Sequence, residues 1–167
     1  MTRGETGAKA PKQEAQAKQM QVEHDGRLGR KRQAEADRAE KTEAKTVNVR
    51  YMVNDVDAAV AFYTTHFGFT LISNAAPAFA DVERGHLRLL ISGAKSSAGR
   101  PMPDGRRPEP GGWNRFELVV EDLADEVRRL RAAGLKFRND IVTGPGGSQI
   151  LVEDPSGNPI ELFQPAR

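Results

Sequence analysis

Apolar and polar side chains alternate along residues 47–53, with valines and Tyr51 at the odd positions and Asn48, Arg50 and Met52 at the even ones. This period-two pattern predicts a β-strand with one face against a packed layer. The even-numbered side chains then look toward more polar surroundings. The first expected element is therefore a half-buried strand.

The spacing of apolar residues becomes helical directly afterwards, in a stripe that runs from Val56 to Tyr63. This stripe predicts an amphipathic helix over about 56–66, with Asp55 or Asp57 as its N-terminal cap. Three further strands are expected around residues 69–74, 78–83 and 86–92. The segment as a whole has the element order βαβββ.

The same order of elements is expected toward the C-terminus. Strands are expected at residues 115–120, 135–139, 149–153 and 160–164, with a helix at 124–133 after the first of them. Turns rich in glycine and proline, at residues 144–147 and 154–158, separate the last strands. This segment is again βαβββ.

The two segments also repeat each other in sequence. Val53-Asn54-Asp55 in the first corresponds to Val120-Glu121-Asp122 in the second, 67 residues later, and Val60 corresponds to Val127 at the same offset. Two copies at so long a period indicate a duplicated module that folds into one body, not a solenoid. The expected fold class is α+β, built from two βαβββ modules.

Residues 1–45 differ from the rest of the chain, because they contain no Phe, Tyr, Trp or Ile. Such a segment has too little apolar surface to offset the entropy of ordering it, so we expect a disordered or weakly helical charged tail. The expected domain is 46–167, with modules at about 46–92 and 113–167. Residues 93–112 carry four prolines and five glycines and form the linker, or a mobile loop over a site.

Composition narrows the function classes. Residues 1–45 carry a net charge of +3 and residues 46–167 a net charge of −1, so the folded part is not expected to bind nucleic acid. The absence of cysteine excludes disulfides and thiolate metal ligands. No apolar run has the length of a membrane span, and no signal peptide is visible, so we expect a cytoplasmic protein without membrane contact.

Two stretches resemble one known family. Asn54 to Tyr63, followed by Gly68-Phe69, resembles the opening of a vicinal oxygen chelate module, and Glu153 to Leu162 resembles the closing hairpin of that family. The family includes glyoxalase I, extradiol dioxygenases and bleomycin-binding proteins. The resemblance covers about residues 47–165. It implies paired βαβββ modules whose curved mixed sheet encloses a cavity, and a homodimer.

The resemblance also implies where a metal would bind. Enzymes of this family place a His on the first strand of each module and a Glu on its last strand, and these side chains suit a divalent cation. The corresponding first-strand residues here are Asn48 and Arg115. Glu161 matches in the second module, whereas the first offers Leu90 or Leu89. We therefore expect no metal and no other cofactor, because a guanidinium is always protonated and cannot coordinate a cation.

An Arg115–Glu161 ion pair is expected in place of the metal, since a carboxylate in an apolar strand requires a partner. The pair either only holds the sheet together or engages a polar group of a ligand. The full set of candidate ligand-binding residues is Arg115, Glu161, Asn48, Arg50, Glu117, Trp113 and Phe163. Met52 shares a face with this set, and His86 is either a metal ligand or an exposed residue at the start of a strand.

Three functions remain open at this point. The expected one is a metal-free small-molecule binding module like the bleomycin-binding proteins, with an Arg/Glu pair in its cavity. The first alternative is a lyase or isomerase of the glyoxalase type, or a dioxygenase-like enzyme, with a degenerate site. The second is a cofactor-independent enzyme that uses the Arg/Glu pair. The identity of the ligand does not follow from the residues.

Overall fold

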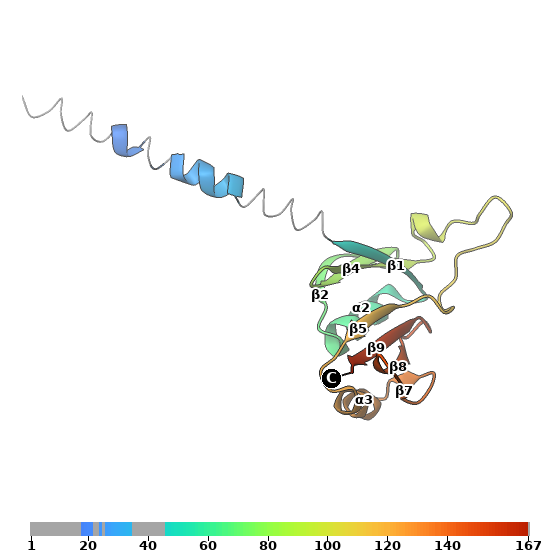
Figure 1. The fold of residues 1–167 in the computed structure, drawn as a ribbon. Helices are drawn as coiled ribbons and strands as arrows, with labels where there is room; N and C mark the ends of the chain where they lie inside the picture. Colours follow the sequence, from blue (N-terminus) through green and yellow to red (C-terminus); the bar gives the residue numbers. More distant parts are fainter. Residues whose placement is uncertain (1–17, 22–23, 25, 35–45, 167) are drawn as a thin grey trace, which may run out of the picture. The chain divides into compact units, whose positions relative to one another are not determined.

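The computed structural model describes residues 18–21, 24, 26–34 and 46–166 (Figure 1). The chain divides into two units, residues 1–45 and 46–167. In the first unit the described residues are helical and exposed. The prediction of a disordered tail concerns mainly residues that lie outside the described part. Among the described residues, no helix is long and apolar enough to cross a membrane.

The first module has the expected order of one strand, one helix and three strands. Its elements are β1 (Val47–Val53), α2 (Val56–His66), β2 (Thr70–Ala75), β3 (Phe79–Arg84) and β4 (Leu87–Gly93). The strands form one mixed sheet in the order β1-β4-β3-β2. Strand β1 runs parallel to β4, and the other pairs are antiparallel.

The second module repeats this arrangement after a short 3-10 helix, η1 (Ser97–Gly99). Its elements are β5 (Phe116–Val119), α3 (Leu123–Ala132), β6 (Lys136–Phe137), β7 (Val142–Gly144), β8 (Gly147–Glu153) and β9 (Pro159–Pro165). The sheet order is β5-β9-β8-β6, with β7 paired to β8. Strand β5 is parallel to β9, as β1 is to β4. The α+β class and the paired βαβββ modules are thereby confirmed, as two mixed sheets (Figure 1).

The helices begin at equivalent aspartates in the two modules. The Asp55 side chain accepts a hydrogen bond of 3.0 Å from the backbone N–H of Ala58 and caps α2. The Asp122 side chain accepts one of 2.8 Å from Asp125 and caps α3. Each thereby satisfies a backbone donor that has no partner within the helix. Of the two aspartates considered for the first helix, Asp55 is therefore the cap.

One core joins the two modules. Tyr51 of β1 stacks on Phe116 of β5 with ring centroids 5.5 Å apart, and Tyr63 of α2 lies 6.3 Å from the same ring. Phe69, at the start of the second strand region, completes the aromatic cluster at 6.2 Å from Phe116. Aromatic pairs of this kind add to the stabilisation that burial gives. The modules therefore form one folded body, not two separate ones.

The expected strand at 135–139 is shorter in the structure. Strand β6 ends at Phe137, and the unpredicted β7 follows on the same partner, β8. The reason is local, because the side chain of Asn139 accepts the hydrogen bond of Leu151 N–H at 2.9 Å. A side-chain amide thus takes the place of a backbone carbonyl and interrupts the ladder.

Each sheet has one face packed into the core with the helices and one face without a helix. We call the second the open face. In the first sheet it consists of the even-numbered residues of β1 and β4 and the odd-numbered residues of β3. In the second sheet it consists of the odd-numbered residues of β5, β8 and β9, together with Arg115 directly before β5. The opposite residues, such as Leu89, Val82 and Ile160, are fully buried.

Candidate functional site

Arg115 and Glu161 lie together on the open face of the second sheet. The Arg115 Nε donates a hydrogen bond to the Glu161 carboxylate, which also makes this an ion pair. The Glu161 side chain is 10% exposed and that of Arg115 is 33% exposed. A second donor of Arg115 reaches the backbone oxygen of Trp113 at 3.1 Å. The predicted contact between the two residues is confirmed.

The register of the sheets shows which residue of the first module corresponds to Glu161. In the second module, Glu161 is the strand partner of Glu117. The residue of the first module that is equivalent to Glu117 is Arg50, and its strand partner is Leu90. Leu90 is half-buried on the open face, whereas Leu89 is fully buried on the helix side. Of the two leucines, Leu90 therefore occupies the position of a carboxylate ligand.

The residues at the four positions where the family holds its metal are not suited to bind a metal ion in this chain. They are Asn48, Leu90, Arg115 and Glu161, which together provide a single carboxylate and no imidazole. The Glu161 carboxylate is already paired with the guanidinium of Arg115, whose positive charge repels a cation. Within the described part of the chain, no group of three or more His, Cys, Asp or Glu side chains is placed to hold a metal ion.

The open face of the first sheet carries a second buried carboxylate, Asp81. It is fully buried and accepts hydrogen bonds from the Ser73 hydroxyl and from Arg88, whose Nε lies 2.6 Å away. Burial acts to raise the pKa of Asp81, but the hydrogen bonds from Ser73 and Arg88 outweigh it, so the pKa lies below its ordinary value. Asp81 is therefore ionised and fully paired.

Of the other candidates, Glu117 and Phe163 lie beside the Arg115–Glu161 pair on the second sheet, whereas Asn48 and Arg50 lie on the first sheet. Asn48, Arg50 and Glu117 are exposed on the open faces, and Phe163 is half-buried two residues after Glu161. The NH1 group of Arg50 donates to the hydroxyl of Ser92. Two residues considered with the set are placed differently: Met52 is half-buried, and His86 is exposed in the turn before β4.

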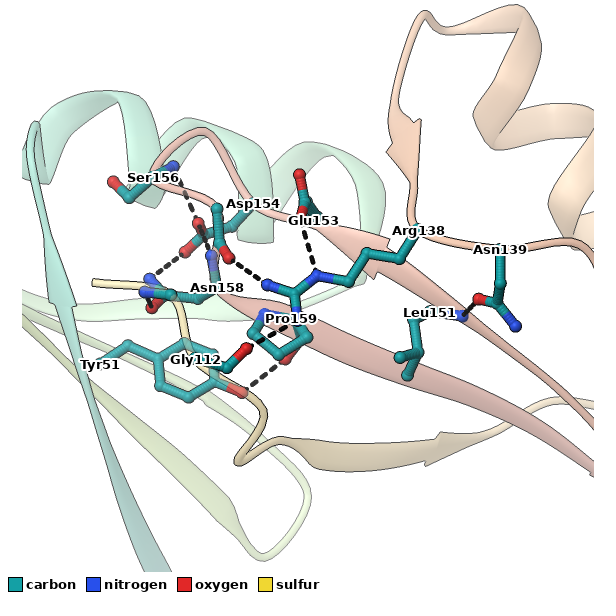
Figure 2. Close-up of polar contacts among 12 residues, drawn as sticks. Tyr51, Gly112, Arg138, Asn139, Leu151, Glu153, Asp154, Ser156, Asn158 and Pro159 are labelled. Carbon is teal, nitrogen blue, oxygen red and sulfur yellow. Dashed lines mark hydrogen bonds and ion pairs between the residues drawn. The ribbon is translucent and has the colours of Figure 1, made fainter.

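Trp113 is 72% exposed, and its partner is a residue that the sequence did not single out. The guanidinium of Arg138 lies over the Trp113 ring, 4.9 Å from its centroid. Arg138 also donates to Glu153 at 2.7 Å and to the backbone oxygens of Gly112 and Gly157 at 2.6 and 2.8 Å (Figure 2). Arg138 therefore fastens the end of the linker to the turn between β8 and β9.

That turn, residues 154–158, also joins the modules. Asp154 accepts hydrogen bonds from the backbone of Ser156 and from both the backbone and side chain of Asn158, at 2.8 to 2.9 Å (Figure 2). The side chain of Asn158 then donates to the backbone oxygen of Met52 in β1 at 2.9 Å. In the sequence this turn stood out only as the family's closing hairpin, and its structural role depends on contacts with distant residues.

A hollow of about 310 Å³ lies beside this turn. It is lined by Phe62 of α2 and by residues 134–136 and 153–155, together with Gly157. None of the candidate ligand-binding residues belongs to this lining. Both of its carboxylates are already paired, Asp154 with Ser156 and Asn158 and Glu153 with Arg138.

Known proteins resemble the chain in sequence pattern and in fold. Residues 45–162 match the family model described as the Glyoxalase/Bleomycin resistance protein/Dioxygenase superfamily. No curated protein matches the chain. Among solved structures, TioX from Micromonospora sp. ML1 has a TM-score of 0.59 at 21% identity, over 72% of this chain and 98% of that one.

Two further solved structures differ in what they are described to do. TnmS3 from Streptomyces sp. CB03234, an antibiotic binding protein, has a TM-score of 0.55 at 24% identity, over 72% of this chain and 95% of that one. Lactoylglutathione lyase from Agrobacterium tumefaciens has a TM-score of 0.56 at 22% identity, over 71% and 91%. At these identities the likeness establishes the fold, which binding proteins and lyases share.

Proposed function

We propose a small-molecule binding function for a chain that belongs to the Glyoxalase/Bleomycin resistance protein/Dioxygenase superfamily. The binding surface is formed by the open faces of the two sheets. The protein acts there without a metal ion and recognises its ligand through side chains. A homodimer and a cytoplasmic location remain predictions.

One observation carries this proposal. The Arg115–Glu161 pair stands at the positions that would supply metal ligands in the second module, and Leu90 and Asn48 stand at those of the first. Arg115 is held by the Glu161 carboxylate and by the backbone oxygen of Trp113, so its remaining N–H groups are hydrogen-bond donors on a fixed guanidinium. Such a group suits the recognition of a polar ligand better than Lewis-acid chemistry.

The remaining candidates extend this surface. Arg50 and Asn48 on β1, Glu117 on β5 and Phe163 on β9 lie on the same open faces, and Trp113 stands at the end of the linker. Together they offer charged, amide and aromatic groups, the mixture that ligand sites use for orientation and for apolar contact. TnmS3, whose fold is similar, is described as an antibiotic binding protein.

Metal analysis and a ligand screen on the same purified protein test the proposal. We expect less than one equivalent of any transition metal, and stabilisation by a subset of small organic molecules in a thermal-shift screen. A ligand present at about 100 times its Kd adds about 2.7 kcal/mol to the free energy of unfolding. Stoichiometric metal bound through Glu161 would contradict the proposal and favour a glyoxalase-type enzyme.

A paired variant locates the binding surface. Replacing both members of the pair, Arg115→Met with Glu161→Leu, removes the polar groups while keeping an apolar, space-filling face. We expect this variant to lose the thermal shift of any ligand found. The matched control is Arg131→Ala on α3, an arginine that also has a carboxylate partner, Asp140, but lies outside the open faces. The control should keep the thermal shift.

A further inference from the structure

Arg50 has a fixed position on the open face of the first sheet, at the centre of the edge strand β1. It lies on β1 opposite Leu90 of β4, and its NH1 group donates to the hydroxyl of Ser92. Ser92 is fully buried, so the hydroxyl that accepts this hydrogen bond has a fixed position and does not contact water. The side chain of Arg50 is exposed beyond this anchor. Its Nε and NH2 donors therefore remain available to a ligand.

The charge of Arg50 is not neutralised, in contrast to that of three other arginines of the domain. Arg88 pairs with Asp81, Arg115 with Glu161, and Arg138 with Glu153. Within residues 46–166, no carboxylate lies at ion-pair distance from Arg50, and its one side-chain partner is the neutral Ser92 hydroxyl. An anchored guanidinium without a counter-charge attracts an oxyanion and matches its geometry.

Apolar side chains lie on one side of Arg50 on the open face. Met52 lies two residues further along the same face of β1, and Leu90 is the strand partner of Arg50 on β4. Phe79 of β3, the strand partner of Ser92, continues this strip. All three side chains are half-buried, so part of their surface is still available. A cation at the edge of an apolar strip is complementary to an anion that carries an apolar body.

The duplication adds an asymmetry of charge. The residue equivalent to Arg50 in the second module is Glu117, which is exposed on the open face of the second sheet and is the strand partner of Glu161. The exposed Glu117 carboxylate repels an anion, whereas the charge of Glu161 is neutralised by Arg115. Of the two equivalent positions, an anionic group is therefore favoured at Arg50 and disfavoured at Glu117.

We infer that Arg50, held by Ser92, is an anion-binding subsite for organic oxyanions, chiefly carboxylates, whose apolar body lies on Met52 and Leu90. This inference rests on the proposed small-molecule binding function and names the chemical class of its ligand. Arg50 supplies the charge and two hydrogen bonds, and the apolar strip supplies contact area.

Titration of the full-length protein with 2-naphthoate, followed by two-dimensional NMR of backbone amides and arginine Nε groups, tests this subsite. We expect perturbed signals to cluster at Arg50, Met52, Leu90 and Ser92. The uncharged 2-naphthamide has the same ring system and should bind at least about tenfold more weakly, because hydrogen bonds to a charged group are stronger than those between neutral groups. A higher salt concentration should weaken the binding of naphthoate and leave the binding of naphthamide unchanged.

Variants separate the role of Arg50 from general charge. Arg50→Gln should weaken naphthoate binding about tenfold or more and leave naphthamide binding unchanged. The matched control is Arg84→Gln, an exposed arginine at the end of β3 on the other side of the same sheet. This control changes the net charge equally and should bind as the wild type. Arg50→Lys keeps the charge, so its affinity for naphthoate should lie between those of the wild type and of Arg50→Gln. This variant tests the subsite if Arg50→Gln is poorly folded.

The outcomes distinguish this inference from the function on which it rests. Equal affinity for naphthoate and naphthamide on the open faces, or naphthoate binding that Arg50→Gln does not weaken, would overturn the anion subsite and leave the binding function standing. Naphthoate signals clustered elsewhere would do the same. If neither compound perturbs the open faces and the thermal-shift screen is also negative, both proposals fail.

Discussion

The Tyr63 hydroxyl donates a hydrogen bond of 3.0 Å to the Asp154 carboxylate, and this contact joins helix α2 of the first module to the closing turn of the second. Tyr63 is fully buried and Asp154 is 4% exposed. Burial raises the pKa of Tyr63 well above its usual value, and the nearby Asp154 charge acts in the same direction. The bond therefore persists through ordinary pH and helps to hold the modules together.

The first prediction is that Tyr63→Phe destabilises the protein modestly. The substitution removes one donor to Asp154, while the carboxylate still accepts hydrogen bonds from Ser156 and Asn158. We expect a loss of about 1 kcal/mol in the free energy of unfolding, measured by urea denaturation.

Asp154→Ala should have a larger effect, above about 3 kcal/mol, because it leaves several buried donors unpaired at once. Asp140→Ala is the matched control, since the Asp140 side chain is 95% exposed. This substitution should lower the free energy of unfolding by less than about 0.5 kcal/mol. If Asp154→Ala were as mild as its control, the turn would not join the modules as described.

The second prediction concerns the Arg115–Glu161 pair. Arg115→Met strands a nearly buried carboxylate beside Glu117, so it should destabilise the protein more than the double variant Arg115→Met with Glu161→Leu. A fully buried pair costs about 3–5 kcal/mol to break. Because a third of the Arg115 side chain is exposed, we expect a smaller loss of about 1–3 kcal/mol.

A double-mutant cycle measures this coupling from urea denaturation of the four proteins. The Arg128–Asp125 pair on α3 is a suitable reference, because both of its side chains are mostly exposed. Its coupling energy should be below about 1 kcal/mol. A coupling of Arg115 and Glu161 no larger than that of this reference pair would show that the ion pair is dispensable.

The fold could be predicted from sequence because its signals are local and repeated. The alternation at residues 47–53 and the capping residues Asp55 and Asp122 each act within a few positions, and the duplication shows every signal twice. The Arg115–Glu161 contact could also be predicted, since both residues match positions that meet in the family. Its role in ligand binding remains a prediction.

Other features of the site depend on tertiary contacts. Arg138 was not singled out because its partners come from two distant segments, Gly112-Trp113 and the turn with Glu153 and Gly157, and no spacing in the sequence marks them. Similarly, alternation alone left Leu89 and Leu90 equivalent, because both are leucines in an apolar strand. Only the pairing with β1 distinguishes them.

The third prediction is that Arg138→Ala releases the end of the linker. Arg138 donates to the backbone of Gly112 and covers Trp113, so its loss should increase the mobility of the indole ring. Trp113 is the only tryptophan in the chain, and its fluorescence anisotropy should fall. The free energy of unfolding should decrease by about 1–2 kcal/mol, because two backbone oxygens and Glu153 lose their donor.

Arg131→Ala provides the comparison for this measurement. Arg131 also lies over an aromatic ring, at 5.4 Å from the centroid of Phe137, and also has an acidic partner, Asp140. It is exposed, however, and should change stability by less than about 0.5 kcal/mol without affecting the tryptophan. Unchanged anisotropy in Arg138→Ala would mean that the indole is held by other contacts.

The fourth prediction is that removal of residues 1–45 leaves the stability of the domain unchanged. This segment contains no aromatic residue and no isoleucine, so its composition provides no apolar anchor. The free energies of unfolding of the full chain and of residues 46–167 should agree within about 0.5 kcal/mol. A loss above about 1 kcal/mol would reveal a packed segment within the tail.

The fifth prediction is that stability falls above pH 10 because of the two tyrosines, which are the only ones in the chain. Burial raises the pKa of Tyr51 to about 12, and its hydroxyl donates to the backbone oxygen of Pro159 at 2.6 Å. In the unfolded chain the pKa returns to about 10. Between about pH 10 and 12 the folded state therefore retains a proton that the unfolded state has lost.

The sign of the effect follows from that difference. Because the unfolded state binds fewer protons in this window, the free energy of unfolding decreases as pH rises, by on the order of 2 kcal/mol for Tyr51. Below about pH 10, Tyr51 contributes no pH dependence. Ultraviolet absorbance of tyrosinate should show native midpoints above 10 that return to about 10 in denaturant. Tyr51→Phe should remove one titrating group and flatten the decline, and a native midpoint near 10 for both tyrosines would contradict their burial at the junction of the modules.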